Sequence, residues 1–383
     1  MFGTKRFPVT YTDPSSNWVS LNAVGVAGDR IFALGGASST RISNSNNSGP
    51  WGLSITLDGS NPWVTQFPED APFTYLGSCL TAQGPEIIDF AFDQKTPSPT
   101  YVRRRQLLLQ NGSLANTITL PFPTNEYLTG VGPTPDGDLL IGTQTALYRM
   151  DTNSIQLIWT VPYISLPAGF PPVDYVEPFI GDWRYDNNKN IVVAMHTAVK
   201  PRGDRYRIGF ASILCINPTG DVVWGPTSHG DPTLSWTSMT LGLGADLRAY
   251  WVTMQCPPNS EEGCVQVMLS YNSDGTENHH GWPRRIDNAV YTQLSTDSEY
   301  VYASGGLGQY GGSTASFPTV ASYDYSGNES TIYLTQYAEE NELWRGNGVI
   351  AADEVFFHLG FASVKGIDDA CLIRKYDKYG LQQ

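Results

Sequence analysis

Charged side chains are scarce in this sequence. Asp, Glu, Lys and Arg make up 16% of the 383 residues, and stretches rich in lysine and glutamate, which favour exposed helices, are missing. The charges that are present are mostly negative, with 37 acidic against 23 basic residues and a formal net charge of −14. Because such a field repels a polyanion, we expect that nucleic acid is not a ligand.

Long apolar runs are also lacking. No segment of about 18 consecutive apolar residues occurs, so we expect no membrane span. The basic residues near the start, Lys5 and Arg6, are not followed by the apolar core of a secretory signal. We therefore expect no signal peptide.

Motifs for metal binding and for catalysis are missing as well. The five histidines form no His-Glu-x-x-His motif, the cysteines form no Cys-x-x-Cys pair, and no Gly-x-Ser-x-Gly nucleophile motif occurs. From these absences we expect no bound cofactor, no metal site and no catalytic residue.

The five cysteines are too few for a disulfide framework in a chain of this length. One pair stands apart, because two strand-like runs around a polar loop place Cys256 opposite Cys264, within reach of one disulfide. The sequence agrees both with a disulfide and with two free thiols, which a reducing compartment would maintain.

Glycine, proline and aromatic residues are abundant instead. The chain has 38 Gly, 26 Pro, 10 Trp and 21 Tyr, a composition that favours short strands joined by tight turns. An apolar strand, a short turn and a second apolar strand recur seven times. The turn residues follow one another at intervals of 52 to 57 residues: Gly28, Gly84, Gly137, Lys189, Asp246, Ser298 and Asp353.

A second hairpin follows in the first six repeats, which gives units of four antiparallel strands. Because such twisted units bury their faces only against their neighbours, the pattern predicts one all-β domain, a seven-bladed β-propeller. The last repeat ends before its fourth strand, and the segment from Lys5 to Asp13 can supply it and close the ring. The predicted blades are 17–68, 72–123, 125–162, 175–227, 234–284, 286–338 and 342–383, with 1–13 as the outer strand of the last blade.

Two hairpins carry a family resemblance. ALYRMDTNSIQLIW, from Ala146, and ASILCINPTGDVVW, from Ala211, resemble the third and fourth strands of quinoprotein-type repeats, in which a turn precedes a docking tryptophan. Trp159, Trp224 and Trp282 occupy the docking position. The chain therefore resembles the β-propeller superfamily, although the Trp-Asp endings of WD-type blades and the Gly-Gly pairs of kelch blades are not repeated, and no quinone cofactor is implied.

The two ends of each predicted blade differ in the length of their connections. Long connections gather at one end, and binding usually resides in loops on a rigid scaffold. The alternative for the arginine clusters there is a solvated strand face. The candidate binding residues are Arg103, Arg104, Arg105, Arg202, Asp204, Arg205, Arg207 and Tyr310.

These features favour a non-catalytic structural or docking component of a larger protein assembly. A virus or bacteriophage particle, on its tail or capsid surface, is a concrete setting, and the expected location is the cytoplasm or such a particle. Other protein subunits are then the expected partners. The alternative is a propeller that recognises a surface glycan, a lectin or a glycosidase-like protein, although an Asp-box-like turn occurs only once, at Ser54 to Trp63.

Overall fold

The structure is a computed structural model in which, over the residues described, every element of regular secondary structure is a strand. The described residues are 9–11, 18–38, 48–67, 73–81, 84–92, 99–121, 126, 128–134, 136–143, 145–151, 156–162, 173–201, 208–230, 234–257, 264–287, 289–307, 317–334, 343–352, 355–364 and 367–377.

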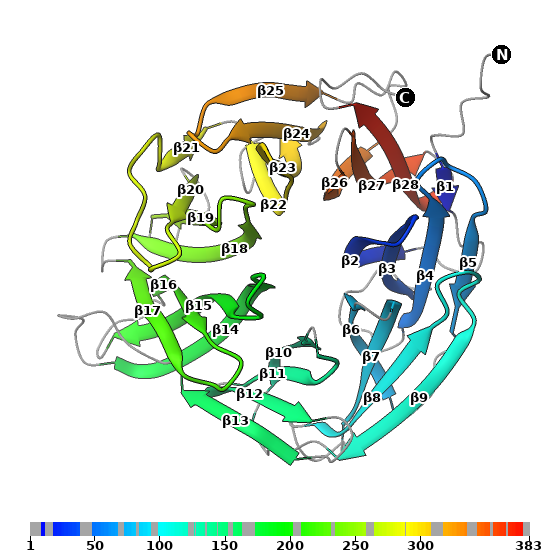
Figure 1. The fold of residues 1–383 in the computed structure, drawn as a ribbon, viewed down its shortest axis with the longest axis horizontal. Helices are drawn as coiled ribbons and strands as arrows, with labels where there is room; N and C mark the ends of the chain where they lie inside the picture. Colours follow the sequence, from blue (N-terminus) through cyan, green and yellow to red (C-terminus); the bar gives the residue numbers. More distant parts are fainter. Residues whose placement is uncertain are drawn as a thin grey trace. The chain divides into compact units, whose positions relative to one another are not determined.

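The strands form four-stranded antiparallel sheets in which neighbours along the chain are neighbours in space (Figure 1). This confirms the prediction of an all-β protein built from four-stranded units. The chain divides into two compact units. Unit 1 comprises Met1–Leu140, Met150–Leu157 and Gln336–Gln383, and unit 2 comprises Ile141–Arg149 and Ile158–Thr335.

Unit 1 contains three of the described sheets. They are β2 (Trp18–Ala27), β3 (Arg30–Ser38), β4 (Ser48–Thr56) and β5 (Trp63–Gln66); β6 (Phe73–Thr81), β7 (Gly84–Phe92), β8 (Pro99–Leu107) and β9 (Leu114–Pro121); and β1 (Val9–Tyr11) with β26 (Leu343–Ala352), β27 (Val355–Val364) and β28 (Ile367–Asp377).

Unit 2 also contains three of the described sheets. They are β14 (Val173–Tyr185), β15 (Ile191–Pro201), β16 (Ile208–Ile216) and β17 (Val222–His229); β18 (Ser235–Leu243), β19 (Ala249–Cys256), β20 (Val265–Tyr271) and β21 (Arg284–Ile286); and β22 (Ala289–Thr296), β23 (Tyr300–Leu307), β24 (Phe317–Asp324) and β25 (Glu329–Leu334). Residues of one further sheet belong to both units: β10 (Leu128–Pro133), β11 (Leu139–Thr143), β12 (Ala146–Asp151) and β13 (Gln156–Pro162).

The first strand of the chain pairs with the last. β1 runs antiparallel to β28, with Val9 opposite Ile373 and Tyr11 opposite Cys371. The last sheet therefore takes its outer strand from the segment that the sequence analysis assigned to this position.

Apolar side chains of adjacent sheets form the core. In unit 1, one buried cluster joins Ile31, Trp51 and Leu53 of the β2–β5 sheet to Phe357 and Ile373 of the sheet that contains β28. In unit 2, two comparable clusters join the β14–β17 sheet to the β18–β21 sheet and the latter to the β22–β25 sheet. Each sheet is thus stabilised by burial of its faces against its neighbours within the unit.

Most hairpins at one end of the sheets are closed by the same type of tight turn. In the turn from Asn217 to Asp221, the N–H of Asn217 donates to the carbonyl of Asp221 and the N–H of Gly220 to the carbonyl of Asn217. This is the three-residue hairpin loop, whose last residue takes a left-handed conformation. Glycine occupies that position at 59, 137, 220, 275 and 327, whereas Lys189 and Leu247 adopt it with φ of 61° and 64°.

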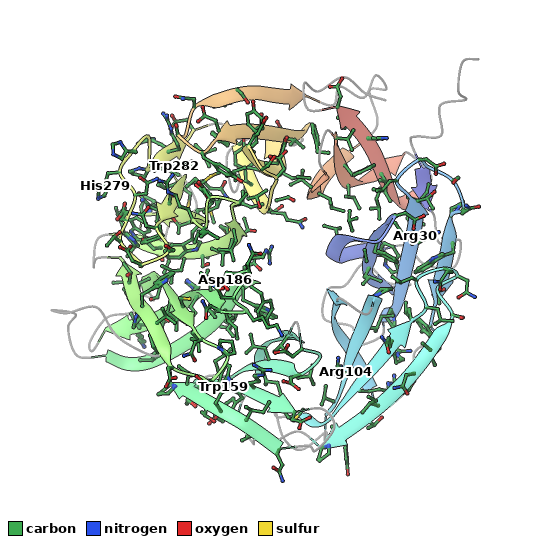
Figure 2. The ribbon with its side chains drawn as sticks, in the orientation of Figure 1. Arg30, Arg104, Trp159, Asp186, His279 and Trp282 are labelled. Atoms are coloured by element: carbon green, nitrogen blue, oxygen red, sulfur yellow. A yellow bond between two sulfur atoms is a disulfide. The ribbon has the colours of Figure 1, made fainter. Side chains whose placement is uncertain are left out.

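An outer-strand tryptophan packs on the outer turn of the next sheet. Trp159 Nε1 donates to the carbonyl of Pro218 at 3.0 Å, and a Cβ at Gly220 would lie 2.7 Å from the Trp159 ring. Trp282 Nε1 donates to the carbonyl of Tyr325 at 3.4 Å in the same way (Figure 2). Only glycine fits beneath the Trp159 ring, and at Gly327 a Cβ would meet the Gly281 carbonyl oxygen at 2.4 Å, so both turns receive the preceding sheet at a glycine.

The same role belongs to Trp63, which the sequence analysis did not assign to the docking position. Its Nε1 donates to the carbonyl of Leu109 at 2.9 Å, and a Cβ at Gly112 would lie 2.4 Å from its ring. Trp224 likewise lies 2.7 Å from the position of a Cβ at Gly275. Tryptophan docking therefore links successive sheets in both units.

Polar side chains add a second set of links between the first strands of the sheets in unit 2. Asp182 follows a β-bulge in β14, and its carboxylate accepts hydrogen bonds from the Leu241 N–H at 2.9 Å and from Thr240 Oγ1 at 3.1 Å. Thr240 follows a bulge in β18 and accepts from the Leu294 N–H at 3.3 Å. The bulges disturb the regular pairing, and side chains of the preceding sheet bind the nearby N–H groups.

The strained turn residue Leu247 provides a stability test. Because a left-handed conformation costs an L-residue roughly 1 kcal/mol, Leu247→Gly should raise the free energy of unfolding by about that amount. Leu247 is exposed, so little packing is lost. Leu247→Ala is the matched control and should show no gain. Urea unfolding measures both, and equal effects of the two substitutions would contradict this assignment.

Candidate functional site

Three of the predicted binding residues lie in the middle of a sheet instead of on an exposed loop. Arg103, Arg104 and Arg105 belong to β8 and are 8%, 7% and 6% exposed. Their side chains alternate in direction along the strand. Arg104 donates to the carbonyl of Gly137 at 2.6 Å, and the Arg105 guanidinium lies 4.7 Å from the centroid of the Phe67 ring (Arg104 is labelled in Figure 2).

Burial means that these arginines face neighbouring parts of the protein and not open solvent. A guanidinium is buried when a carbonyl or an aromatic face replaces water around it, and both occur here. Arg104 links its sheet to the turn before β11, and Arg105 links it to the segment after β5. Their role in binding a partner stays a prediction.

The other predicted binding residues lie outside the described part of the chain. They are Arg202, Asp204, Arg205, Arg207 and Tyr310. The strand residues on either side of the first four are described: Pro201 ends β15 and Ile208 begins β16.

Cys256 and Cys264 form a disulfide with their Cα atoms 4.2 Å apart. Cys256 ends β19 and Cys264 precedes β20, so the bond closes the base of the connection between these two strands. Cys256 is also paired across the sheet with Ser235, the first residue of β18. Three strand ends of this sheet are thus held together at the end where the long connections begin.

The start of β18 lies tightly against the preceding sheet in unit 2. Ser235 Oγ accepts the Gly209 N–H at 2.8 Å, and the His196 Nδ1 lies 3.1 Å from the carbonyl oxygen of Trp236. A Cβ at Gly209 would lie 2.7 Å from both the His196 ring and that carbonyl. The close approach of the two sheets therefore depends on the absence of a side chain at residue 209.

A histidine and several aromatic rings gather beside this contact. The His229 ring stacks on Trp236 at a centroid distance of 5.2 Å and meets the edge of Trp251 at 5.9 Å. Its Nε2 is hydrogen-bonded to the Tyr271 hydroxyl. The exposed Phe179 ring stacks on His196 at 6.0 Å. We call His196, His229, Trp236, Trp251 and Tyr271 the histidine–aromatic cluster.

Burial controls the charge of this cluster. It lowers the pKa of His229, and the nearby Glu277 carboxylate offsets only part of that effect. Burial also raises the pKa of Tyr271. At neutral pH the imidazole is therefore uncharged and the phenol keeps its proton, so the Tyr271 hydroxyl donates to His229 Nε2. The pair is suited to holding two sheets together and supplies no charged group for binding.

The histidine–aromatic cluster was not predicted from the sequence. His229 is separated from Tyr271 by 42 residues and lies in a different sheet. Across the described residues, no group of three or more His, Cys, Asp or Glu side chains is placed to hold a metal ion. None of the described segments is a helix long and apolar enough to cross a membrane.

Comparison with known proteins gives no family. No family model and no curated protein matches the chain. Among solved structures, a protein of unknown function from Bacteroides caccae is 11% identical over 73% of this chain and 90% of its own, with a TM-score of 0.39. The WD40 domain of SCAP from fission yeast is 11% identical over 83% of this chain and 76% of its own, with a TM-score of 0.38.

A prolyl endopeptidase structure is similarly distant. It is 10% identical over 96% of this chain, with a TM-score of 0.49, and the match covers 48% of the endopeptidase. This chain therefore spans about half of that protein's length. Similarity at these levels assigns no activity to the chain.

The neutral state of His229 makes stability depend on pH. The pKa of a histidine is about 6.5 in the unfolded chain, and burial lowers it in the folded protein. The unfolded state then binds more protons, so this contribution to stability is complete above about pH 6.5 and is lost as the pH falls towards the folded pKa.

His229→Gln should therefore flatten the loss of unfolding free energy between about pH 7 and pH 5. His280→Gln is the matched control, because His280 is exposed, and this variant should keep the slope of the wild type. Urea unfolding at several pH values measures both. A slope that persists in the His229 variant, or disappears in the His280 variant, would contradict the assignment.

Proposed function

We propose that the chain is one seven-bladed β-propeller whose ring is closed by pairing of β1 with β28. The support is threefold. The described sheets have four strands each, successive sheets pack on one another within each unit, and the last sheet takes its outer strand from the start of the chain. A closed ring leaves no sheet face without a neighbour, which is what such twisted sheets require.

We further propose that this propeller is a non-catalytic docking component of a larger protein assembly, such as the tail or capsid surface of a virus or bacteriophage. One observation supports this most: the two ends of the sheets are built differently. At one end, five-residue turns such as those from Asn217 to Asp221 and from Gly244 to Arg248 satisfy their own backbone hydrogen bonds. At the other end, connections of six to nine residues follow β3, β7, β15, β19 and β23, and the disulfide holds the base of the one after β19.

Such a difference fits a scaffold that carries its contact surface at one end. Fixing the base of a loop lowers the entropy that binding would otherwise cost. The histidine–aromatic cluster, in which His229 is uncharged and Trp251 and Tyr271 are buried, lies beside the start of β18 and supports this end of the sheets in unit 2. Stable contact with other protein subunits is the function that this arrangement serves best.

Ring closure is tested by deleting residues 1–13. The deletion should strongly lower the thermal stability, because it exposes β28 and removes the outer strand of the last sheet. A deletion of residues 1–4, which spares the predicted strand, is the control. Moving residues 5–13 behind residue 383 on a short linker should restore stability, since an antiparallel strand can follow β28 as a hairpin. A harmless deletion of residues 1–13 would refute closure.

Docking is tested by substitutions at the two opposite ends of the sheets in unit 2. Glu261→Lys with Glu262→Lys changes the long connection between β19 and β20, and Ser298→Lys with Glu299→Lys changes the tight turn after β22. The first pair should lose subunits that copurify with the tagged chain from its native source, and the second pair should retain them, as mass spectrometry can show. Retention of the subunits by both variants would contradict docking at the end of the sheets that carries the longer connections, which we call the long-connection end. Binding on a glycan array would favour the alternative, a carbohydrate-recognising propeller.

A further inference from the structure

β9 is an open sheet edge with unusual properties. It is the last strand of its sheet, and no described strand pairs with its outer side. Its eight residues, LANTITLP, contain no charge. From Asn116 to Pro121 it pairs with β8 without interruption, so the outer backbone groups of this segment form a regular row.

The other outer strands in the described part of the chain are protected by familiar devices. β1 and β21 have three residues each, and β5 has four. β21 also carries two arginines, and β25 begins with Glu329. β17 matches β9 in length but is interrupted by Gly225 and Pro226 and by shifts of register. Short length, charge, proline and irregular pairing are the usual means of preventing edge-to-edge contact.

β9 has a register shift near Leu114 and a proline at position 121, but both lie at its ends, and no charge interrupts the regular segment between them. Much of the strand is open to solvent. Leu114, Asn116, Thr117 and Thr119 are all exposed. β13 is also uncharged, but it buries Trp159 and Val161. An exposed, regular and uncharged edge of this length is a template for one more strand.

We propose that β9 pairs antiparallel with β9 of a second copy of this chain, which joins two sheets across a two-fold axis. Charge favours this location. Two copies that each carry a net charge of −14 repel one another. Contact between them is therefore least unfavourable where neither surface bears charge. The proposal rests on β9 alone and is independent of docking at the long-connection end.

The two ends of β9 are also complementary to each other. Leu114, 48% exposed, begins the strand, and Tyr101, 49% exposed, pairs with Pro121 at its end. Residues that pair across a two-fold axis point to the same face of the joined sheet, so the axis passes through a residue position. An axis through Ile118 places Thr117 of one copy opposite Thr119 of the other and Ala115 opposite Pro121, which is beside Tyr101. Leu114 adjoins this outer pair. The threonines and Asn116 then lie in the centre, where polar and β-branched cross-strand pairs are favourable. The contact is isologous and closes on itself, as expected for a dimer.

Sedimentation equilibrium of the full chain tests the proposal. The wild type should pass from monomer to dimer as its concentration rises. Thr117→Lys with Thr119→Lys sets like charges against each other across the two-fold axis and should weaken the dimer by about tenfold or more. Thr160→Lys on β13 is the matched control and should leave the dimer unchanged. Circular dichroism and thermal unfolding establish that each variant is folded.

Hydrogen exchange provides a second readout in the unmodified protein. The outward-facing amides of residues 114–120 should become protected as the concentration rises, whereas those of β13 and β17 should not. A wild type that stays monomeric at the highest concentration would overturn the proposal. A dimer that Thr160→Lys disrupts, or one that forms without protection of the outward-facing amides of residues 114–120, would also overturn it.

Discussion

The docking of an outer-strand tryptophan on the glycine turn of the next sheet is the contact on which the rest of the structure depends. A four-stranded sheet has two faces to cover, and Trp63, Trp159 and Trp224 each cover part of the following sheet at a point where no side chain fits. The turns that receive the rings differ in length, since the turn from Leu108 to Ser113 that receives Trp63 is one residue longer than the turn from Asn217 to Asp221. The contact therefore fixes the glycine beneath the ring, Gly112 or Gly220, and not the length of the turn.

Much of this architecture could be predicted because it is encoded locally. Apolar hairpins and turns rich in Gly, Asp and Asn recur within each repeat, and both signals depend on residues only a few positions apart. Trp159 and Trp282 were assigned to docking from their place after the turn of a second hairpin, although their partners lie 59 and 43 residues further along the chain. Trp63 stands at the same place, after the turn from Thr56 to Ser60, and its partner is 46 residues away. The signal for Trp63 was therefore present in the sequence and was missed.

The candidate site was harder to predict, because a charged residue type does not determine exposure. Arg103, Arg104 and Arg105 stand in a row that is equally suitable for a solvated strand or for a strand between two sheets. Only the neighbouring sheets decide, by offering a carbonyl at Gly137 and a ring at Phe67. The contact between His229 and Tyr271 is likewise made between sheets, so spacing along the chain carries no signal for it.

The polar links between first strands distinguish the two units. After the bulges of β14 and β18, Asp182 and Thr240 accept N–H groups of the next sheet. At the corresponding positions in unit 1, Ala23, Gly77 and Gly348 offer no side-chain acceptor. Links between first strands thus add to the apolar packing in unit 2, whereas unit 1 makes its cross-sheet hydrogen bonds elsewhere, from Trp63 and Arg104, and the disulfide lies in unit 2. A docking surface must keep its shape while a partner binds, so these added links support the placement of that surface at the long-connection end of unit 2.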